Sequence, residues 1–398
     1  MTTSPKIVTG LDVLLGDESL LSKLRNRRIG LLVNPTSVTS GLDHAIEACE
    51  GAGLNLVRLF GPEHGVRADA QDMEAVDETV DPISGIETIS LYGDSFDSLR
   101  PDPAHLHDLD TVICDIQDIG ARYYTYVYTI GMMMDACGDA DVPVVVVDRP
   151  NPINGTDVEG NVVVDEMRSF VGMQPIATRH GMTAGELAHF FDRFCGWSCE
   201  LEVVEMKGWT RSMWYDDTGL PWVMPSPNMP TLDTATVYPG QCLLEGTNIS
   251  EARGTTRPFE LFGAPFIDAP ALRDYLEQID LEGVAFRTTA FKPMFQKHAN
   301  TTCRGLQIHV TDRDRFSSLR TSYALVAGIL QLHPDQFQWR TEAYEFVTDR
   351  LAIDLLIGDK EVRLALENGA DPLELVDALS EDRRQFENRR DQCLLYDE

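Results

Sequence analysis

The first half of the chain alternates short apolar runs with segments in which apolar residues recur every three or four positions. Five runs rich in Val, Ile and Leu predict β-strands, at residues 28–33, 54–60, 111–115, 144–147 and 201–204. Helical spacing is found between them, at residues 41–53, 126–137 and 181–194. Strands that are apolar along their whole length and separated by helices are typical of a parallel sheet covered on both faces. The pattern therefore predicts a Rossmann-like, doubly wound α/β domain.

The pattern changes after Trp209. Five prolines between residues 221 and 239 predict a loop-like stretch without regular elements. Further along we expect α+β structure, with helix at 272–279, strand at 305–310, helix at 317–332 and helices with turns at 343–386. We therefore expect two domains, a Rossmann-like one over residues 1–212 and a smaller α+β domain over residues 213–398.

The charge excludes one class of partner and indicates an environment. The 398 residues include 64 Asp and Glu but only 33 Lys and Arg, of which six are Lys, for a net charge of −31. A chain this acidic lacks the basic footprint that nucleic-acid binding requires. Self-repulsion of such a surface is screened at about 1 M salt, where the Debye length is about 3 Å. We therefore expect a halophilic protein that works in a salt-rich cytosol.

The cysteines and the start of the chain concern its compartment. Eight scattered cysteines with no CxxC pair favour reduced thiols over a zinc site or a disulfide framework. The longest apolar run, Val142–Val147, is far shorter than the ~18 residues of a membrane span. No secretory signal is visible at the start of the chain. We expect a cytoplasmic protein without a membrane partner.

Polar, turn-rich clusters follow the predicted strands. In open α/β sheets ligands bind beyond the carboxyl ends of the strands, so we expect these side chains to converge at one edge. They are Asn34, Glu63, His64, Asp115, Asp118, Asp148, Arg149 and Asn151. No GxGxxG or P-loop pattern is present, nor any HxH, HExxH or GxSxG spacing. The sequence thus offers no support for a nucleotide cofactor, a metal site or a serine hydrolase, and we expect no cofactor.

Glu63 lies in a predicted tight turn behind the second strand, backed by Phe60 and Pro62. An apolar setting raises the pKa of a carboxyl group, which is the property that a general acid needs. A turn residue that caps a loop would look the same in the sequence.

The segment 115–126 is denser in polar chemistry. Asp115 and Asp118 are carboxylates, Arg122 could bind a substrate carboxylate in a bidentate manner, and Tyr124 and Tyr126 offer the apolar face and polar hydroxyl that suit sugars. The structural alternative is that an Asp pairs with Arg122 while the tyrosines fill a domain interface.

Three further places offer polar groups. His180 precedes the capping box Thr183–Glu186, so it is expected just before a helix and facing the cleft. The stretches 225–231 and 245–250, which include Asn228, Glu245 and Asn248, are polar loops. Such loops recognise sugar hydroxyls, but they serve equally as stiff connectors.

Six strings, taken together and in order, carry a resemblance over nearly the whole chain. They are Phe60–Gly65, Asp115–Tyr126, Asp148–Pro152, Arg179–Thr183, Pro225–Thr231, and Tyr238–Gly240 with Glu245–Asn248. The chain resembles the NamZ-type exo-β-N-acetylmuramidase family. The resemblance implies a Rossmann-like domain, a smaller C-terminal domain and an active cleft between them. It also implies release of terminal β-1,4-linked N-acetylmuramic acid from the non-reducing end of peptidoglycan fragments. One departure is Ala252, where we expect a glycine before Arg253.

Glycoside hydrolysis usually needs two carboxyl groups, about 5–5.5 Å apart in retaining enzymes and about 6.5–9.5 Å apart in inverting ones. The resemblance implies that Glu63 is the catalytic acid. Asp118 or Asp115 is the expected second carboxylate, unless the acetamido group of the substrate replaces it. Arg122 or Arg253 would bind the lactyl carboxylate. Other expected contacts of the saccharide or muropeptide substrate are Asn34, His64, Tyr124, Tyr126, His180, Asn228, Glu245 and Asn248. The alternative is a non-catalytic protein on the same scaffold that binds an amino sugar or a glycan.

The charge generates the first prediction. Dialysis from about 1 M salt into about 0.01 M salt lengthens the Debye length from about 3 Å to about 30 Å, and the unscreened acidic surface should then unfold the protein. Circular dichroism during stepwise dialysis measures this. A signal that does not change with salt would contradict the halophilic interpretation.

Overall fold

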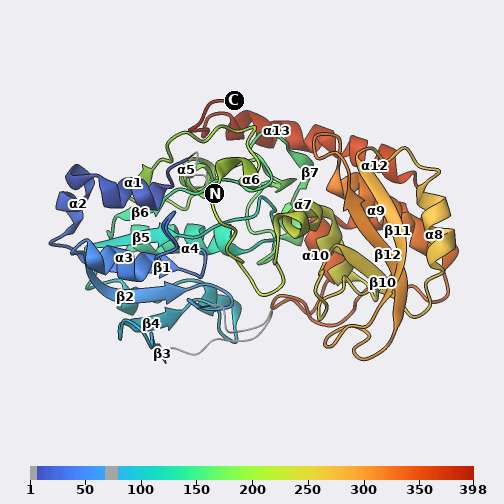
Figure 1. Cartoon of the computed structure of the whole chain (residues 1–398), viewed down its shortest axis with the longest axis horizontal. Helices are drawn as coiled ribbons and strands as arrows, with labels where there is room; N and C mark the ends of the chain where they lie inside the picture. The colour runs from blue at the N-terminus through green and yellow to red at the C-terminus, as the bar shows by residue number, and fades with distance from the viewer. Residues whose placement is uncertain (1–6, 68–78) are drawn as a thin grey trace.

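The computed structural model describes residues 7–67 and 79–398, and within them the two halves of the chain build different sheets (Figure 1). The first half forms a seven-stranded sheet in the order β3-β4-β2-β1-β5-β6-β9. Its strands are β1 (Arg28–Val33), β2 (Asn55–Gly61), β3 (Thr79–Val80), β4 (Glu87–Ser90), β5 (Thr111–Asp115), β6 (Val144–Val147) and β9 (Leu201–Val204). All neighbours pair in parallel except β3, which runs antiparallel to β4 at the edge. The five predicted strands are confirmed.

Helices cover both faces of this sheet. Successive strand residues point to opposite sides, so apolar strands give the sheet two apolar faces to bury. Leu31 packs in one apolar cluster with α1 (Gly10–Gly16), α2 (Glu18–Leu24) and α3 (Ala45–Gly51). Leu32 packs in another with α4 (Tyr126–Asp139) and α5 (Ala184–Phe194). The predicted doubly wound α/β architecture is therefore confirmed, although α1, α2 and β4 were not expected.

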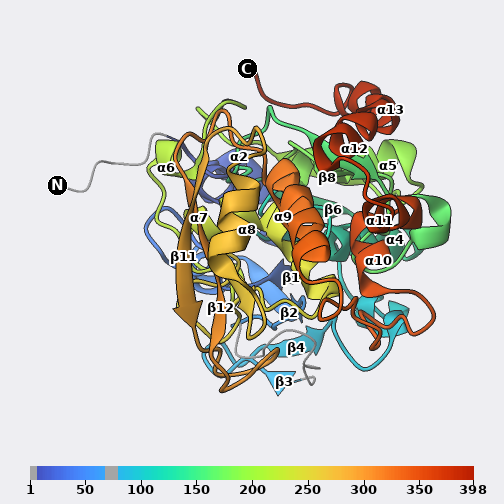
Figure 2. The ribbon, with the colours of Figure 1, turned by 90° about the vertical axis from the view of Figure 1, so that its right-hand side faces the viewer.

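The second half is the predicted smaller α+β part. An antiparallel sheet is formed by β10 (Leu261–Ala264), β12 (Cys303–Val310) and β11 (Val284–Phe291), in that order. The helices α8 (Ala269–Leu276) and α9 (Ser318–Leu332) lie side by side (Figure 2). They lie close to the two predicted helices, and β12 contains the predicted strand. A separate two-stranded ribbon of β7 (Glu159–Val162) and β8 (Ala177–Arg179) precedes α5, and α6 (Tyr215–Thr218) follows β9 in the chain.

Part of the proline-rich stretch is helical, contrary to expectation. The helix α7 (Leu232–Gln241) contains Pro239 near its end. Thr231 caps its N-terminus, because the Thr231 hydroxyl accepts a hydrogen bond from the Thr234 amide. The Gly240 amide donates to Ser318 at 2.7 Å, so tertiary contact with α9 replaces the local bonding that proline disturbs.

The prediction of helix over residues 343–386 is wrong for its first nine residues. Helices begin only with α10 (Ala352–Ile357), followed by α11 (Lys360–Glu367), α12 (Pro372–Ala378) and α13 (Ser380–Arg390). Before them Glu345 and Phe346 have φ angles of 46° and 67°, in the left-handed region that a helix excludes.

The last residues return to the first half of the chain. The Tyr396 hydroxyl donates to Asp148 at 2.6 Å, and the Leu395 amide donates to Glu186 at 2.9 Å. α13 also packs on α5 and β7. The boundary near residue 212 stays a prediction.

The cysteines and the helix lengths concern the expected reduced thiols and the membrane. All eight cysteines are free thiols, as expected. Among residues 7–67 and 79–398, no helix has the length and apolar character required to cross a bilayer.

Arg122 joins the two halves through a fully buried guanidinium. Its Nη1 donates to the Asn161 carbonyl at 2.7 Å, and its Nη2 donates to the carbonyls of Leu356 and Ile357 at 2.9 and 2.6 Å. The last two carbonyls end α10, where a cation also interacts favourably with the helix dipole. The side chain is therefore committed to the protein interior, and the prediction that Arg122 binds the substrate carboxylate is corrected.

Replacing Arg122 should destabilise the protein. Arg122→Met is expected to lower the free energy of unfolding by about 3 kcal/mol or more, since each buried carbonyl that loses its donor costs about 1–3 kcal/mol. Urea unfolding at fixed salt measures the change. Arg315→Met removes a guanidinium that is 60 % exposed and should shift stability by less than about 0.5 kcal/mol. Equal unfolding midpoints for the two variants would refute the role given to Arg122.

Candidate active site

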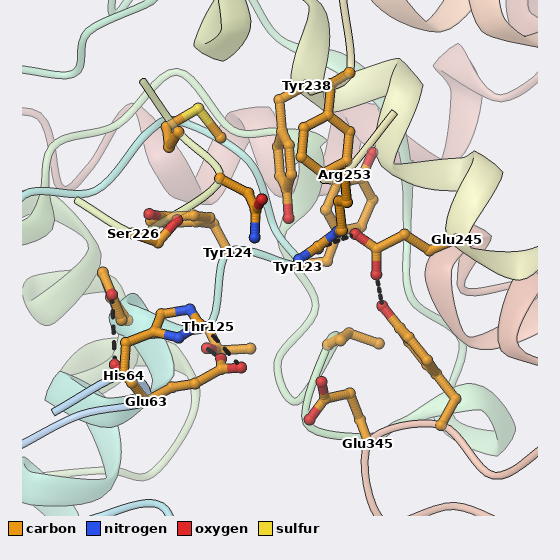
Figure 3. Close-up of a pocket in the computed structure, with 16 residues that line it drawn as sticks. Glu63, His64, Tyr123, Tyr124, Thr125, Ser226, Tyr238, Glu245, Arg253 and Glu345 are labelled. Atoms are coloured by element: carbon orange, nitrogen blue, oxygen red, sulfur yellow. Dashed lines mark hydrogen bonds and ion pairs between the residues drawn. The ribbon is translucent and has the colours of Figure 1, made fainter. Parts of the chain in front are cut away.

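A pocket with about 600 Å³ of open space lies where the ends of β2 and β5 meet segments of the second half (Figure 3). The lining residues are Glu63, His64, Tyr123, Tyr124, Thr125, Tyr126, Val171, Ser226, Asn228, Met229, Tyr238, Glu245, Arg253, Phe259, Tyr344 and Glu345. Seven of them are predicted site residues: Glu63, His64, Tyr124, Tyr126, Asn228, Glu245 and Arg253.

Glu63 is presented by a tight turn just beyond β2, as expected. The Gly65 amide closes the turn on the Pro62 carbonyl at 2.9 Å, with φ angles of 70° at His64 and 80° at Gly65. The Thr125 hydroxyl donates to Glu63 Oε2 at 3.0 Å, and His64 Nε2 lies 4.0 Å from Oε1. Glu63 is only 9 % exposed, so its carboxyl group meets a ligand in a site that excludes most water.

Glu245 occupies another side of the pocket. It lies in a short 3₁₀ turn, Cys242–Gly246, directly after α7. Arg253 Nη2 donates to Glu245 Oε1 at 2.6 Å, and the Tyr344 hydroxyl donates to Oε2 at 2.8 Å. Burial raises the pKa of Tyr344, which therefore stays protonated as a donor. Both carboxyl oxygens of Glu245 are therefore hydrogen-bonded within the protein.

Arg253 follows the residue at which we expected glycine. Ala252 has a φ of 63°, a conformation that glycine adopts without strain, so the expectation has a conformational basis. Arg253 nevertheless reaches the pocket, and its guanidinium lies 5.2 Å from the centre of the Phe259 ring.

Glu345 is a third carboxyl group at the pocket, and the sequence did not indicate it. Figure 3 shows it across the open space from Glu63, on the segment before α10. The Tyr92 hydroxyl donates to its Oε2 at 3.1 Å, and the neighbouring Phe346 packs on Tyr92 with ring centres 5.7 Å apart. No local motif marks Glu345, because long-range packing brings it to the site.

Aromatic rings form much of the remaining wall. Tyr124 packs edge-to-face on Tyr126 and Tyr238, with ring centres 4.9 and 5.8 Å apart. Burial raises the pKa of Tyr124 and Tyr126, so both hydroxyls are protonated. The Tyr126 hydroxyl donates to the Pro225 carbonyl at 2.7 Å and so fixes the proline-rich loop that carries Asn228. Rings and amides of this kind suit the faces and hydroxyls of a sugar.

Two predicted carboxylates and two other predicted residues lie outside the lining. Asp115 is fully buried and accepts from Arg149 Nη2 at 2.8 Å. Asp118 accepts the Gly120 amide at 2.7 Å and lies 3.1 Å from His180 Nε2. The side chain of Asn34 accepts the Thr36 amide at 3.0 Å. The structure therefore does not bring Asp115, Asp118, Asn34 or His180 to the pocket with Glu63. Polar residues that pack in the interior and residues that line the pocket both follow the strands of this sheet. Position after a strand therefore does not distinguish the two kinds.

The structure also places the expected capping box and Asn248. Thr183 and Glu186 do form the predicted capping box of α5. Asn248 lines an adjoining hollow instead of the pocket. Within the part of the chain that the structure describes, no group of three or more His, Cys, Asp or Glu side chains could hold a metal ion.

Comparisons with known proteins agree with the resemblance seen in the motifs. Residues 29–233 match the family model "Exo-beta-N-acetylmuramidase NamZ, N-terminal", and residues 236–396 match its C-terminal counterpart. The chain is 42 % identical, over 98 % of its length and 92 % of the relative's, to the peptidoglycan β-N-acetylmuramidase NamZ of Bacillus subtilis.

Solved structures show the same architecture. A DUF1343 family protein of Bacteroides fragilis is 34 % identical with a TM-score of 0.87, covering 99 % of this chain and 100 % of that one. A second protein of that family and organism is 27 % identical with a TM-score of 0.73, covering 98 % and 99 % of the two chains. The chain belongs to the exo-β-N-acetylmuramidase NamZ family.

Proposed function

We propose that this protein is an exo-acting glycosidase that releases terminal β-1,4-linked N-acetylmuramic acid from the non-reducing end of peptidoglycan fragments. The observation that carries the proposal is the pocket in which Glu63 shares one space with Glu245 and Glu345. Glycosidases place two carboxyl groups around the bond that they cleave. The relative from Bacillus subtilis, which is 42 % identical, is a peptidoglycan β-N-acetylmuramidase, and this supports a peptidoglycan substrate for the present protein.

Glu63 is one member of the catalytic pair in this proposal. One carboxyl group protonates the leaving oxygen as the C1–O bond breaks, and the other acts at C1 directly or through water. The partner of Glu63 is Glu245 or Glu345, in place of Asp115 or Asp118, because these two line the same pocket. The acetamido group of the substrate is the other candidate for the second role.

Arg253 is the residue that we propose for the lactyl carboxylate. It lines the pocket, whereas Arg122 is committed to backbone carbonyls elsewhere. A guanidinium can bind a carboxylate in a bidentate manner while it also contacts Glu245. The rings of Tyr124 and Tyr238 and the amide of Asn228 supply the sugar-binding surface.

We also propose a cytoplasmic location in a salt-rich cell, where murein fragments, a related amino sugar or an acidic glycan would be the substrate. Eight free thiols support a reducing compartment. The net charge of −31 supports the salt-rich setting.

Removing the Glu63 carboxylic acid should abolish turnover but not binding. Glu63→Gln is expected to lower kcat on the disaccharide N-acetylmuramyl-β-1,4-N-acetylglucosamine by about 10²–10⁴-fold, as for loss of a general acid or base. The Kd measured by calorimetry should hardly change, because the amide keeps the shape and an acceptor. Glu87→Gln, at a 56 % exposed side chain, is the control and should keep full activity. Unreduced kcat in Glu63→Gln would remove Glu63 from the mechanism.

Replacing Arg253 should reduce discrimination between muramic acid and glucosamine. A hydrogen bond to a charged group contributes about 1.5–3 kcal/mol, so Arg253→Gln is expected to lower kcat/KM for a muramide about 10–100-fold more than for the matching glucosaminide. Arg257→Gln, at a 47 % exposed guanidinium, should leave the ratio unchanged. An equal loss on both substrates would mean that Arg253 serves only to hold Glu245.

A further inference from the structure

A second hollow, which we name the outer hollow, adjoins the pocket and has a volume of about 490 Å³. Its lining residues are Glu245, Thr247, Asn248, Glu251, Gln296, Lys297, Gln338, Trp339, Arg340, Thr341 and Glu342. Glu245 belongs to both sites. Tyr344, whose hydroxyl bonds Glu245, also packs 5.1 Å from the Arg340 guanidinium. Glu245, Tyr344 and Arg340 therefore lie at the boundary where the two sites meet.

The outer hollow has the surface chemistry of a carbohydrate site. Trp339 is half-buried, with its indole N–H bonded to Glu367 at 2.7 Å and its ring packed on Phe337 at 4.7 Å between centres. Amides and hydroxyls surround it, including those of Gln338 and Thr341. A ring that offers a face, together with neutral donors and acceptors, recognises a sugar better than an ion.

Two cations line the outer hollow, and both are already engaged: Lys297 by Glu251 and backbone carbonyls, and Arg340 by the Ala343 carbonyl at 3.1 Å. Lys297 Nζ lies 2.7 Å from Glu251 Oε2 and donates to the carbonyls of Leu244 and Ile249 at 2.7 and 2.8 Å. The acidic groups Glu245 and Glu342 also line this hollow. These carboxylates would repel an acidic stem peptide, whereas they would not repel an uncharged amino sugar.

The loops that form the outer hollow are held in place before any ligand arrives. Asn248 exchanges backbone and side-chain hydrogen bonds with Gln338, at 2.9 and 3.1 Å. The His298 ring bonds the Asn248 carbonyl at 2.8 Å, and the Met294 amide bonds Gly254, next to Arg253, at 3.0 Å. A preformed surface loses little conformational entropy on binding.

We propose that the outer hollow binds the saccharide leaving group, the next N-acetylglucosamine of the glycan, while the pocket binds the terminal muramic acid. This inference rests on the proposed function. Hydrolysis of the terminal linkage needs the remainder of the chain to lie against the wall of the pocket, and Glu245 marks where the two sites meet. Binding energy from this second sugar would be used in the transition state as the linkage breaks.

The experiment compares a substrate that fills the outer hollow with one that does not. The first is N-acetylmuramyl-β-1,4-N-acetylglucosamine, and the second is the β-fluoride of N-acetylmuramic acid, whose leaving group is a single fluoride ion. The variants are Gln338→Ala and Trp339→Ala. Gln336→Ala is the matched control, an exposed glutamine of the same loop outside the lining.

We expect kcat/KM for the disaccharide to fall about tenfold in Gln338→Ala and Trp339→Ala, the factor that about 1.4 kcal/mol of lost contact produces. Turnover of the fluoride should stay within about twofold of the parent, as should both substrates in Gln336→Ala. If Trp339→Ala fails to fold, as thermal unfolding would show, Gln338→Ala alone carries the test.

Each other result overturns the inference. Equal losses on both substrates, or no loss on the disaccharide, would show that the outer hollow does not bind the leaving sugar. A loss confined to disaccharide that carries a stem peptide on the lactyl group would assign the hollow to the peptide. If the parent protein turns over neither substrate, the proposed function itself fails.

Discussion

The buried guanidinium of Arg122 is the constraint on which the geometry of the site depends. It lies in the loop that carries Tyr123 to Tyr126, and it donates to the carbonyl end of α10, which follows the segment with Tyr344 and Glu345. A buried cation is stable only where polar groups replace its hydration, and aligned carbonyls at a helix end do so. One side chain thus holds two walls of the pocket in fixed relation, through hydrogen bonds to residues 234 and 235 positions along the chain.

The two halves of the chain contribute different chemistry to the site. The parallel sheet supplies Glu63 and the tyrosines from its strand ends, where ligands bind in this architecture. The second half supplies Glu245, Arg253 and Glu345 from loops around its antiparallel sheet. The second half thus supplies two carboxyl groups and a cation, while Glu63 and the tyrosines reach the pocket only from the first half. The outer hollow extends this arrangement along the second half, which suits a substrate longer than one sugar.

The fold was predictable where burial is complete and local rules agree. The limits of β1, β5 and β6 follow from runs of Val, Ile and Leu buried on both faces. The capping box at Thr183 is equally local. The helix α7 was missed because its contact with α9 overrides the effect of proline. Among the candidate site residues, motif positions could not separate Asp115, which pairs with Arg149 in the interior, from Glu63, which faces the pocket. Glu345 could not be found at all, since only tertiary packing brings it there.

The most direct test is hydrolysis of p-nitrophenyl β-N-acetylmuramide beside the corresponding glucosaminide, by the full chain at high and at low salt. The account predicts release of nitrophenol from the muramide, with strong selectivity over the glucosaminide, under the salt conditions in which the protein is folded. Absence of release from folded protein that still binds muramic acid would contradict it. Such a result would favour a glycan-binding protein that has kept the scaffold without the catalysis.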